Sequence, residues 1–178
     1  MIERIIIAGS GGQGVMLLGK VLAQTAMLEG KQVTWFPAYG PEVRGGTSHC
    51  MVIISDQEIG SPYISQADTL IILNRPSLER FKGKLKKNGI LILNSSLAAI
   101  DKYAKMQVLS FPFTDIAIKI GNIKVANMAA LGCFAAAKKI IKVKNILKVF
   151  KSIAPAGNLE ILKINQQALE EGQKLNHG

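Results

Sequence analysis

Residues 4–14 read RIIIAGSGGQG, an apolar, β-branched run that passes directly into a glycine-rich loop. The run Arg4–Ala8 has no polar alternation, which is typical of a strand buried on both faces of a sheet. Apolar residues then recur at helical spacing from Val15 to Leu28, and Gly30 is positioned to end that helix. A buried strand, a glycine corner and a helix in this order predict the first unit of an α/β fold.

Strands and helices alternate along most of the chain that follows. Apolar and β-branched runs predict further strands at Gln32–Phe36, Thr47–Ser55, Asp68–Leu73, Ile90–Leu93 and Gln107–Phe111. Helical spacing predicts helices at about Pro76–Leu85, Asp115–Ile120, Ala126–Ile141, Asn145–Ile153 and Leu159–Leu175. We also expect a turn at Asp56-Gln57 before a short return strand, Glu58–Ile59, and a turn at Asn88-Gly89.

These elements predict one domain over residues 1–178. We expect a three-layer α/β/α, Rossmann-like fold with a mostly parallel, mixed sheet and a helical C-terminal part, because the strands are uniformly apolar. The 178 residues are 48% hydrophobic and 19% charged, which excludes an intrinsically disordered chain. No leader and no long apolar run is apparent, so we expect a cytoplasmic protein without a membrane span.

The positive charge is concentrated in the second half of the chain. Residues 1–80 carry 6 basic and 7 acidic side chains, whereas residues 81–178 carry 16 and 5. The densest run, Lys138–Lys151, favours helical turns with a solvated lysine face, and an anion-attracting surface is the alternative interpretation. Arginine is sparse and aromatic residues make up 6%, so we expect no nucleic acid partner.

The loop Gly9-Ser10-Gly11-Gly12-Gln13-Gly14 matches the pattern G-x-G-x-x-G at a strand–helix junction. Gly9 and Gly11 are expected to permit the tight turn, and Gly14 to let the helix pack near the strand. Together with the positive end of the helix dipole, four main-chain N–H groups are predicted to bind a phosphate or carboxylate: those of Gly11, Gly12, Gln13 and Gly14.

The acidic residue that a dinucleotide site needs at the end of the second strand is missing. Glu29 falls on the helix end instead, and the second strand ends in Phe36-Pro37-Ala38. NAD or FAD binding is therefore disfavoured, and no Walker lysine motif supports ATP hydrolysis. A tight strand–helix turn without any ligand remains open.

A second irregular segment, residues 37–48, reads PAYGPEVRGGTS. Its glycines and prolines exclude regular structure, and long loops after a strand are where α/β proteins place binding groups. Arg44 has the paired donors to clamp a carboxylate, a phosphate or an acidic partner residue. A surface ion pair with Glu42 is the alternative.

Two cysteines, Cys50 and Cys133, are too few to ligate an iron–sulfur cluster or a four-cysteine zinc ion, and we expect both to be reduced and buried. His49 and Cys50 are neighbours on one predicted strand and point to opposite faces, so we expect no base–nucleophile pair. Gly132, which follows an alanine-rich run, predicts a helix that approaches another backbone closely.

Three motifs follow one another along the chain: GGQGV at residues 11–15, YGPEVRGGT at 39–47 and VANMAALG at 125–132. Together they resemble the gamma subunit of 2-oxoacid:ferredoxin oxidoreductases, and the resemblance extends over essentially the whole chain, including Asn165 and Ala168 of the closing helix. The second motif is most similar to the 2-oxoglutarate branch, with the branched-chain 2-oxoacid branch close behind. The pyruvate and indolepyruvate branches are less similar.

The resemblance implies an enzyme of several subunits that converts a 2-oxoacid and coenzyme A into an acyl-CoA and CO2 while it reduces ferredoxin, or runs in reverse. It places thiamine diphosphate and Mg²⁺ between the alpha and beta subunits, and [4Fe–4S] clusters on the beta and delta subunits. The expected partners are these alpha, beta and delta subunits, with ferredoxin bound through the complex. The chain itself would hold no metal and no catalytic residue, and would be inactive alone.

For this chain's own part in such a complex we hypothesise that it completes the assembly, and we assign roles to its loops from their residues. The glycine loop is expected to help build the coenzyme A side of the site, and Asn127 to order that crevice. The second loop is expected to lie against the alpha or beta subunit near the substrate channel, through Tyr39, Gly40, Pro41, Glu42, Arg44, Gly45, Gly46 and Thr47. Two alternatives remain, a nucleotide-binding oxidoreductase that acts alone and a non-catalytic assembly scaffold.

Overall fold

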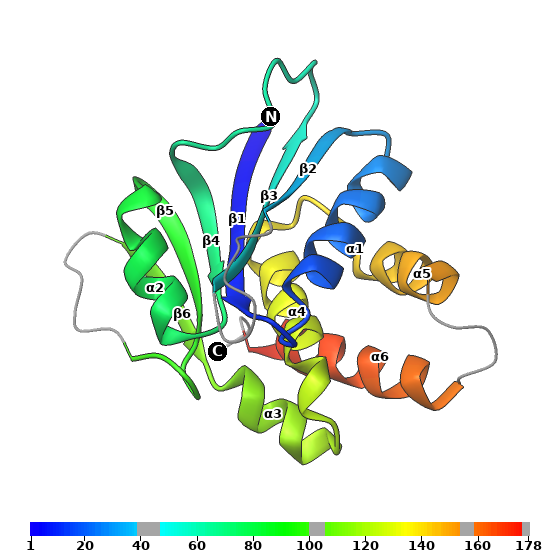
Figure 1. Cartoon of the computed structure of the whole chain (residues 1–178). Coiled ribbons are helices and arrows are strands. Elements are labelled where there is room, and N and C mark those ends of the chain that lie inside the picture. The colour runs from blue at the N-terminus through cyan, green and yellow to red at the C-terminus, as the bar shows by residue number, and fades with distance from the viewer. Residues whose placement is uncertain (39–46, 100–105, 154–158, 176–178) are drawn as a thin grey trace.

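Six strands form one sheet in the computed structural model of the chain (Figure 1). They are β1 (Ile2–Ser10), β2 (Gln32–Ala38), β3 (Thr47–Ser55), β4 (Ala67–Ile72), β5 (Leu85–Asn94) and β6 (Gln107–Phe111). The structure describes residues 1–38, 47–99, 106–153 and 159–175. Across the sheet the strands are arranged in the order β2-β3-β1-β4-β5-β6.

The sheet is mixed, and its parallel part begins at β1. β1 pairs in parallel with β4, which continues in parallel to β5 and β6. On its other edge β1 pairs antiparallel with β3, and β3 pairs antiparallel with β2. Thr47 lies opposite Ser10, so β3 begins beside the carboxyl end of β1. Three of the five strand pairings are therefore parallel, which confirms the predicted mixed sheet.

Helices cover both faces of this sheet. They are α1 (Val15–Leu28), α2 (Arg75–Phe81), α3 (Phe113–Ile120), α4 (Ala126–Lys138), α5 (Val143–Ile153) and α6 (Leu159–Lys174), with single 3-10 turns η1 (Lys82–Lys84) and η2 (Ile123–Val125). Ile5 and Ile7 belong to the core under α1 and the C-terminal helices, whereas Ile6 packs on the opposite face with Leu78 and Phe81 of α2. The alternation of side chains along β1 thus produces the three predicted layers.

The predicted return strand at Glu58–Ile59 and the predicted turn at Asn88-Gly89 are wrong, whereas the chain does bend at Asp56-Gln57. Residues 58–59 form no strand, because β3 already has β1 on one edge and β2 on the other and offers no free edge. Asn88 and Gly89 lie inside β5, which begins at Leu85, so the preceding helix ends earlier than predicted. A Cβ on Gly89 would lie 2.5 Å from Leu85 Cδ1, which shows that this glycine serves strand packing rather than a turn.

Gly132 and Gly172 lie where α4 and α6 cross. A Cβ on Gly132 would lie 2.0 Å from the carbonyl oxygen of Leu169, and one on Gly172 would lie 1.9 Å from that of Ala129. Only glycine lets the two backbones come this close, which confirms the close approach predicted for the alanine-rich helix and identifies α6 as its neighbour. None of the helices described here has the length and apolar character that crossing a membrane requires.

Candidate functional site

The glycine loop lies at the carboxyl end of β1, where the direction of the chain changes. From β1 the chain continues through α1 to β2 and β3 on one side of the sheet, and then returns to the other side of β1 with β4. In α/β sheets such a change of direction opens a crevice beyond the strand ends, where ligands bind. Asn74 follows β4 at this edge, and its Nδ2 donates a hydrogen bond to the hydroxyl of Ser10.

Gly14 begins α1 and is held by a residue of a distant helix. Its φ of 71° lies in the left-handed region, and its carbonyl oxygen accepts hydrogen bonds from Leu18 N at 2.9 Å and Asn127 Nδ2 at 3.1 Å. A Cβ here would lie 2.3 Å from Asn127 Nδ2. Gly14 therefore makes room for Asn127 of α4, rather than for a strand as the pattern predicted. The buried Oδ1 of Asn127 has no hydrogen-bond partner among the described residues.

The side chain of Gln13 folds back into the loop. Its Oε1 accepts a hydrogen bond from Ser10 N at 2.7 Å, and its Nε2 donates to the carbonyl oxygen of Leu73 at 3.2 Å. Its main-chain N–H donates to the carbonyl oxygen of Ser10, so this amide is already engaged. A Cβ on Gly9 would lie 2.7 Å from Gln13 Oε1, which is why glycine is needed beneath the folded-back side chain.

Gly11 and Gly12 form the exposed tip of the loop. Within the described part of the chain, no hydrogen bond from either main-chain N–H is recorded. Gly12 has a φ of 90°, which an L side chain rarely adopts, whereas a side chain on Gly11 would meet open space. Two exposed amides next to the start of a helix, without an acceptor in the described part of the chain, are suited to bind an anionic group.

A cavity of about 160 Å³ adjoins Gly12 and Gln13. Its polar part is built by Asn94 at the end of β5, which donates hydrogen bonds to the carbonyl oxygen of Leu73 at 3.1 Å and to Thr114 Oγ1 at 2.8 Å. Lys124 of η2 also lines the cavity and brings a positive charge to this edge. Sequence reasoning missed Asn94 and Lys124; the asparagine that ends the apolar run Ile90–Leu93 was the available signal.

The structure places part of the second predicted loop. Thr47 begins β3 opposite Ser10, at the same edge of the sheet as the glycine loop. The other predicted members, Tyr39, Gly40, Pro41, Glu42, Arg44, Gly45 and Gly46, lie outside the described residues.

Glu29 has a structural role at the other end of α1. Its Oε1 accepts hydrogen bonds from Lys142 N and Asn145 Nδ2, both at 2.8 Å, and so it caps the start of α5. Glu29 follows the last residue of α1, as expected, and its carboxylate is directed to α5. Because its carboxylate is engaged in this cap, Glu29 does not serve as the acidic residue that would bind the ribose of a dinucleotide.

His49 and Cys50 point to opposite faces of the sheet, as predicted. The His49 ring lies 4.8 Å from that of Phe81, and burial together with the positive charges of Arg80 and Lys84 lowers the pKa of His49. Cys50 Sγ lies 3.7 Å from the carbonyl oxygen of Val15, and burial raises the pKa of the thiol to about 12. Among the described residues, no three His, Cys, Asp or Glu side chains gather where a metal ion could bind.

The sequence profile of the family "Pyruvate ferredoxin/flavodoxin oxidoreductase" matches residues 4–175, which is nearly the whole chain. The chain belongs to this family. The resemblance predicted from the three motifs is thereby confirmed at the level of the family.

Individual members of the pyruvate ferredoxin/flavodoxin oxidoreductase family are similar over most of the chain. The ketoisovalerate oxidoreductase subunit VorA of Methanothermobacter marburgensis is 38% identical over 169 residues, which are 95% of this chain and 35% of that protein. The 2-oxoglutarate synthase subunit KorC of the same organism is 33% identical over 186 residues, covering 98% of this chain and 100% of KorC. The chain thus spans about a third of the length of VorA and the full length of KorC.

A solved structure confirms the fold of this family member. The gamma subunit of a keto/oxoacid ferredoxin oxidoreductase from Geobacter sulfurreducens superposes with a TM-score of 0.83 at 30% sequence identity, and the match covers 97% of each chain. The predicted gamma-type α/β fold is therefore correct.

Proposed function

We propose that this chain is the gamma component of a cytoplasmic 2-oxoacid:ferredoxin oxidoreductase and acts only within that complex. Family membership and the full-length similarity to KorC support this proposal. We favour 2-oxoglutarate as the substrate, on the form of the motif at residues 39–47; the relative named for ketoisovalerate supports a branched-chain 2-oxoacid as the alternative.

In this proposal the redox chemistry belongs to partner subunits. Thiamine diphosphate with Mg²⁺, held between the alpha and beta subunits, supplies the chemistry that cleaves the 2-oxoacid, and [4Fe–4S] clusters on the beta and delta subunits pass the electrons to ferredoxin. The two cysteines of this chain are both buried thiols. Its own contribution is made by main-chain amides and a lysine at the edge of the sheet.

The glycine loop is proposed to bind an anionic group of coenzyme A. The observation that carries this assignment is the pair of exposed amides of Gly11 and Gly12 near the start of α1, which have no recorded hydrogen-bond acceptor among the described residues. Lys124, across the adjoining cavity, adds a positive charge that favours the same phosphate groups. Asn127 acts on the loop through Gly14, since its hydrogen bond fixes the residue from which α1 begins.

The test is the coenzyme A KM of the assembled complex carrying Gly11→Asp. Gly11 is the best position, because a side chain there meets open space and its backbone is not in the left-handed region. Like charges about 8 Å apart in a partly solvated site repel by about 1–2 kcal/mol, so we expect KM to rise about tenfold. Gly60→Asp is the matched control, since Gly60 is equally exposed, meets open space and lies outside the crevice.

The result also separates the proposal from its alternatives. A complex that is active with an unchanged KM would leave the chain as an assembly scaffold only. Retention of a flavin or nicotinamide by the purified chain would favour an oxidoreductase that acts alone.

A further inference from the structure

Asn94 ends β5 at the same edge of the sheet as the glycine loop, and its side chain is completely buried. Its Nδ2 donates hydrogen bonds to the carbonyl oxygen of Leu73 at 3.1 Å and to Thr114 Oγ1 at 2.8 Å, and its Oδ1 accepts one from Thr114 N at 3.2 Å. The Leu73 carbonyl needs a donor and Thr114 N needs an acceptor, so an amide matches both whereas a carboxylate matches only one. These partners hold the Asn94 amide in one orientation.

The carbonyl oxygen of Leu73 is the point at which these hydrogen bonds meet the glycine loop. It accepts hydrogen bonds from Asn94 Nδ2 and also from Gln13 Nε2, at 3.2 Å. A carbonyl oxygen has two lone pairs, so the two donors together saturate it. The main-chain N–H of Leu73 donates to the carbonyl oxygen of Ala8 in β1 at 2.8 Å. The residue that follows β4 is therefore fixed from both neighbouring strands.

Gln13 connects this fixed carbonyl to the rest of the loop. Its Oε1 accepts a hydrogen bond from Ser10 N at 2.7 Å, and its main-chain N–H donates to the carbonyl oxygen of Ser10 at 3.2 Å. Asn74, which also follows β4, donates to the hydroxyl of Ser10. Gly11 and Gly12 are the two residues that these bonds enclose, so the bonds set the direction of their main-chain N–H groups.

We propose that Asn94 is a positioning residue for the glycine loop: it holds the Leu73 carbonyl, through which Gln13 keeps the two exposed amides of the loop in one orientation. The inference rests on the proposed function, because it concerns how the same anion-binding loop is preorganised. Preorganised donors bind a ligand without the entropy loss of ordering the loop. Asn94 does not bind the anionic group itself, since both of its N–H groups are engaged within the chain.

The test is Asn94→Asp in the assembled complex. The carboxylate keeps an acceptor for Thr114 N but sets an oxygen, instead of a donor, against the Leu73 carbonyl. Hydrogen exchange measured by mass spectrometry on a peptide of residues 9–16 reports on Ser10 N–H, which Gln13 protects. We expect this amide to exchange about tenfold faster, as the loss of one hydrogen bond allows. The coenzyme A KM should rise, with kcat and the KM of the 2-oxoacid unchanged.

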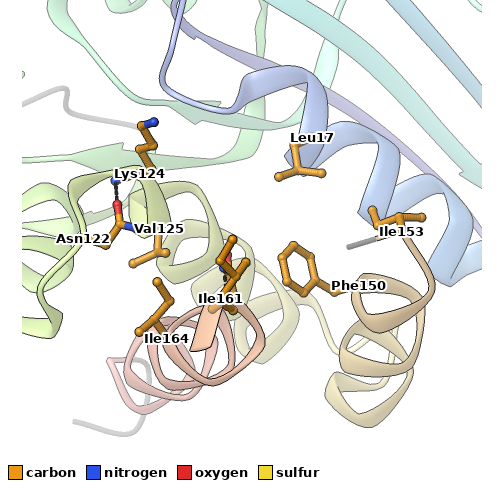
Figure 2. Close-up of a pocket in the computed structure, with 9 residues that line it drawn as sticks. Leu17, Asn122, Lys124, Val125, Phe150, Ile153, Ile161 and Ile164 are labelled. Atoms are coloured by element: carbon orange, nitrogen blue, oxygen red, sulfur yellow. Dashed lines mark hydrogen bonds between the residues drawn. The ribbon is translucent and has the colours of Figure 1, made fainter. Parts of the chain in front are cut away.

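Asn165→Asp is the matched control. Asn165 of α6 is also buried, and it lines the apolar groove in which Figure 2 shows Phe150 and Ile161. Its Nδ2 donates to the carbonyl oxygen of Ile161 at 2.7 Å, within the same helix. The control therefore places the same charge at a buried asparagine whose recorded hydrogen bond does not involve the loop. Stability should fall in this variant too, but the exchange of the loop peptide and the coenzyme A KM should stay at their wild-type values.

A double variant shows whether Asn94 acts through Gln13. Gln13→Leu removes the acceptor of Ser10 N, so in this background Asn94→Asp should make the exchange of Ser10 no faster. Thr114→Val removes one of the two acceptors of Asn94 Nδ2 and should produce a smaller change in the same direction as Asn94→Asp. This milder variant tests the inference even if Asn94→Asp does not fold.

Equal exchange of the loop peptide in the wild type, Asn94→Asp and Thr114→Val would refute the positioning role. A further acceleration by Asn94→Asp in the Gln13→Leu background would also overturn it, because Asn94 would then act by another route. The same holds for faster exchange with an unchanged coenzyme A KM, if Gly11→Asp does raise that KM. If exchange becomes faster and neither Asn94→Asp nor Gly11→Asp changes the KM, Asn94 positions the loop and the proposed coenzyme A role of the loop fails.

Discussion

Replacing Gly132 by alanine tests the crossing of α4 and α6 most directly. The added Cβ would lie 2.0 Å from the carbonyl oxygen of Leu169, whereas carbon–oxygen contacts between helices are found at about 3.3 Å or more. The obstacle is backbone, which cannot rotate away as a side chain would. The two helices must therefore separate by about 1.3 Å, or the crossing must distort.

Two effects of opposite sign decide the result. Alanine in place of glycine inside a helix stabilises it by about 1 kcal/mol. Overpacking of a well-packed contact costs about 1–3 kcal/mol, and a contact with backbone belongs at the upper end. We therefore expect a net destabilisation of about 2 kcal/mol, which in a domain of this size lowers Tm by about 4–8 °C.

Thermal unfolding followed by circular dichroism measures this change, with Gly83→Ala as the control because a Cβ on Gly83 meets nothing within 4 Å. Gly172→Ala lies at the same crossing, and the double variant should lose less than the two single losses added together. A Tm of Gly132→Ala equal to or above that of the wild type would mean that helix propensity outweighs the contact, and the close crossing would be refuted.

Three further predictions concern single side chains. Hydrogen bonds from Lys31 and from the N-terminal ammonium hold the pKa of Asp56 at about 2, so its contribution to stability is present above its unfolded-state pKa of about 4 and is lost as pH falls through about 2. The difference in urea midpoint between wild type and Asp56→Asn should shrink over that range, and a difference independent of pH would contradict this. Because burial raises the pKa of the Cys50 thiol to about 12, iodoacetamide at pH 8 should leave Cys50 unmodified in the native protein and modify it in urea, as mass spectrometry would show. Gly14→Ala should lower the free energy of unfolding by about 2 kcal/mol, since it combines a left-handed φ with a clash against Asn127, and unchanged urea unfolding would show that the loop relaxes freely.

The local sequence pattern predicted the bounds of a helix or strand well where a glycine marked its end or its start. The bounds of Val15–Leu28 and of Thr47–Ser55 agree with the structure, because a glycine ends or precedes each of them in the sequence. The prediction of a return strand at residues 58–59 was wrong for a non-local reason. β1 and β2 occupy both edges of β3, and the residues of the turn carry no information about those strands. The turn predicted at Asn88-Gly89 was wrong for a similar reason. Gly89 lies inside β5, where a Cβ would clash with the side chain of Leu85.

The sequence by itself determined the α/β class, the glycine corner at the first strand–helix junction and the family, because strand runs, helical spacing and the three motifs are properties of neighbouring residues. Only the tertiary structure decided that the main-chain N–H of Gln13 is engaged within the loop, which residue holds Gly14 and what Glu29 does. Asn127 reaches Gly14, and Lys142 reaches Glu29, across 113 residues of sequence in each case. Such contacts depend on how the helices pack on the sheet, and no local periodicity encodes that packing.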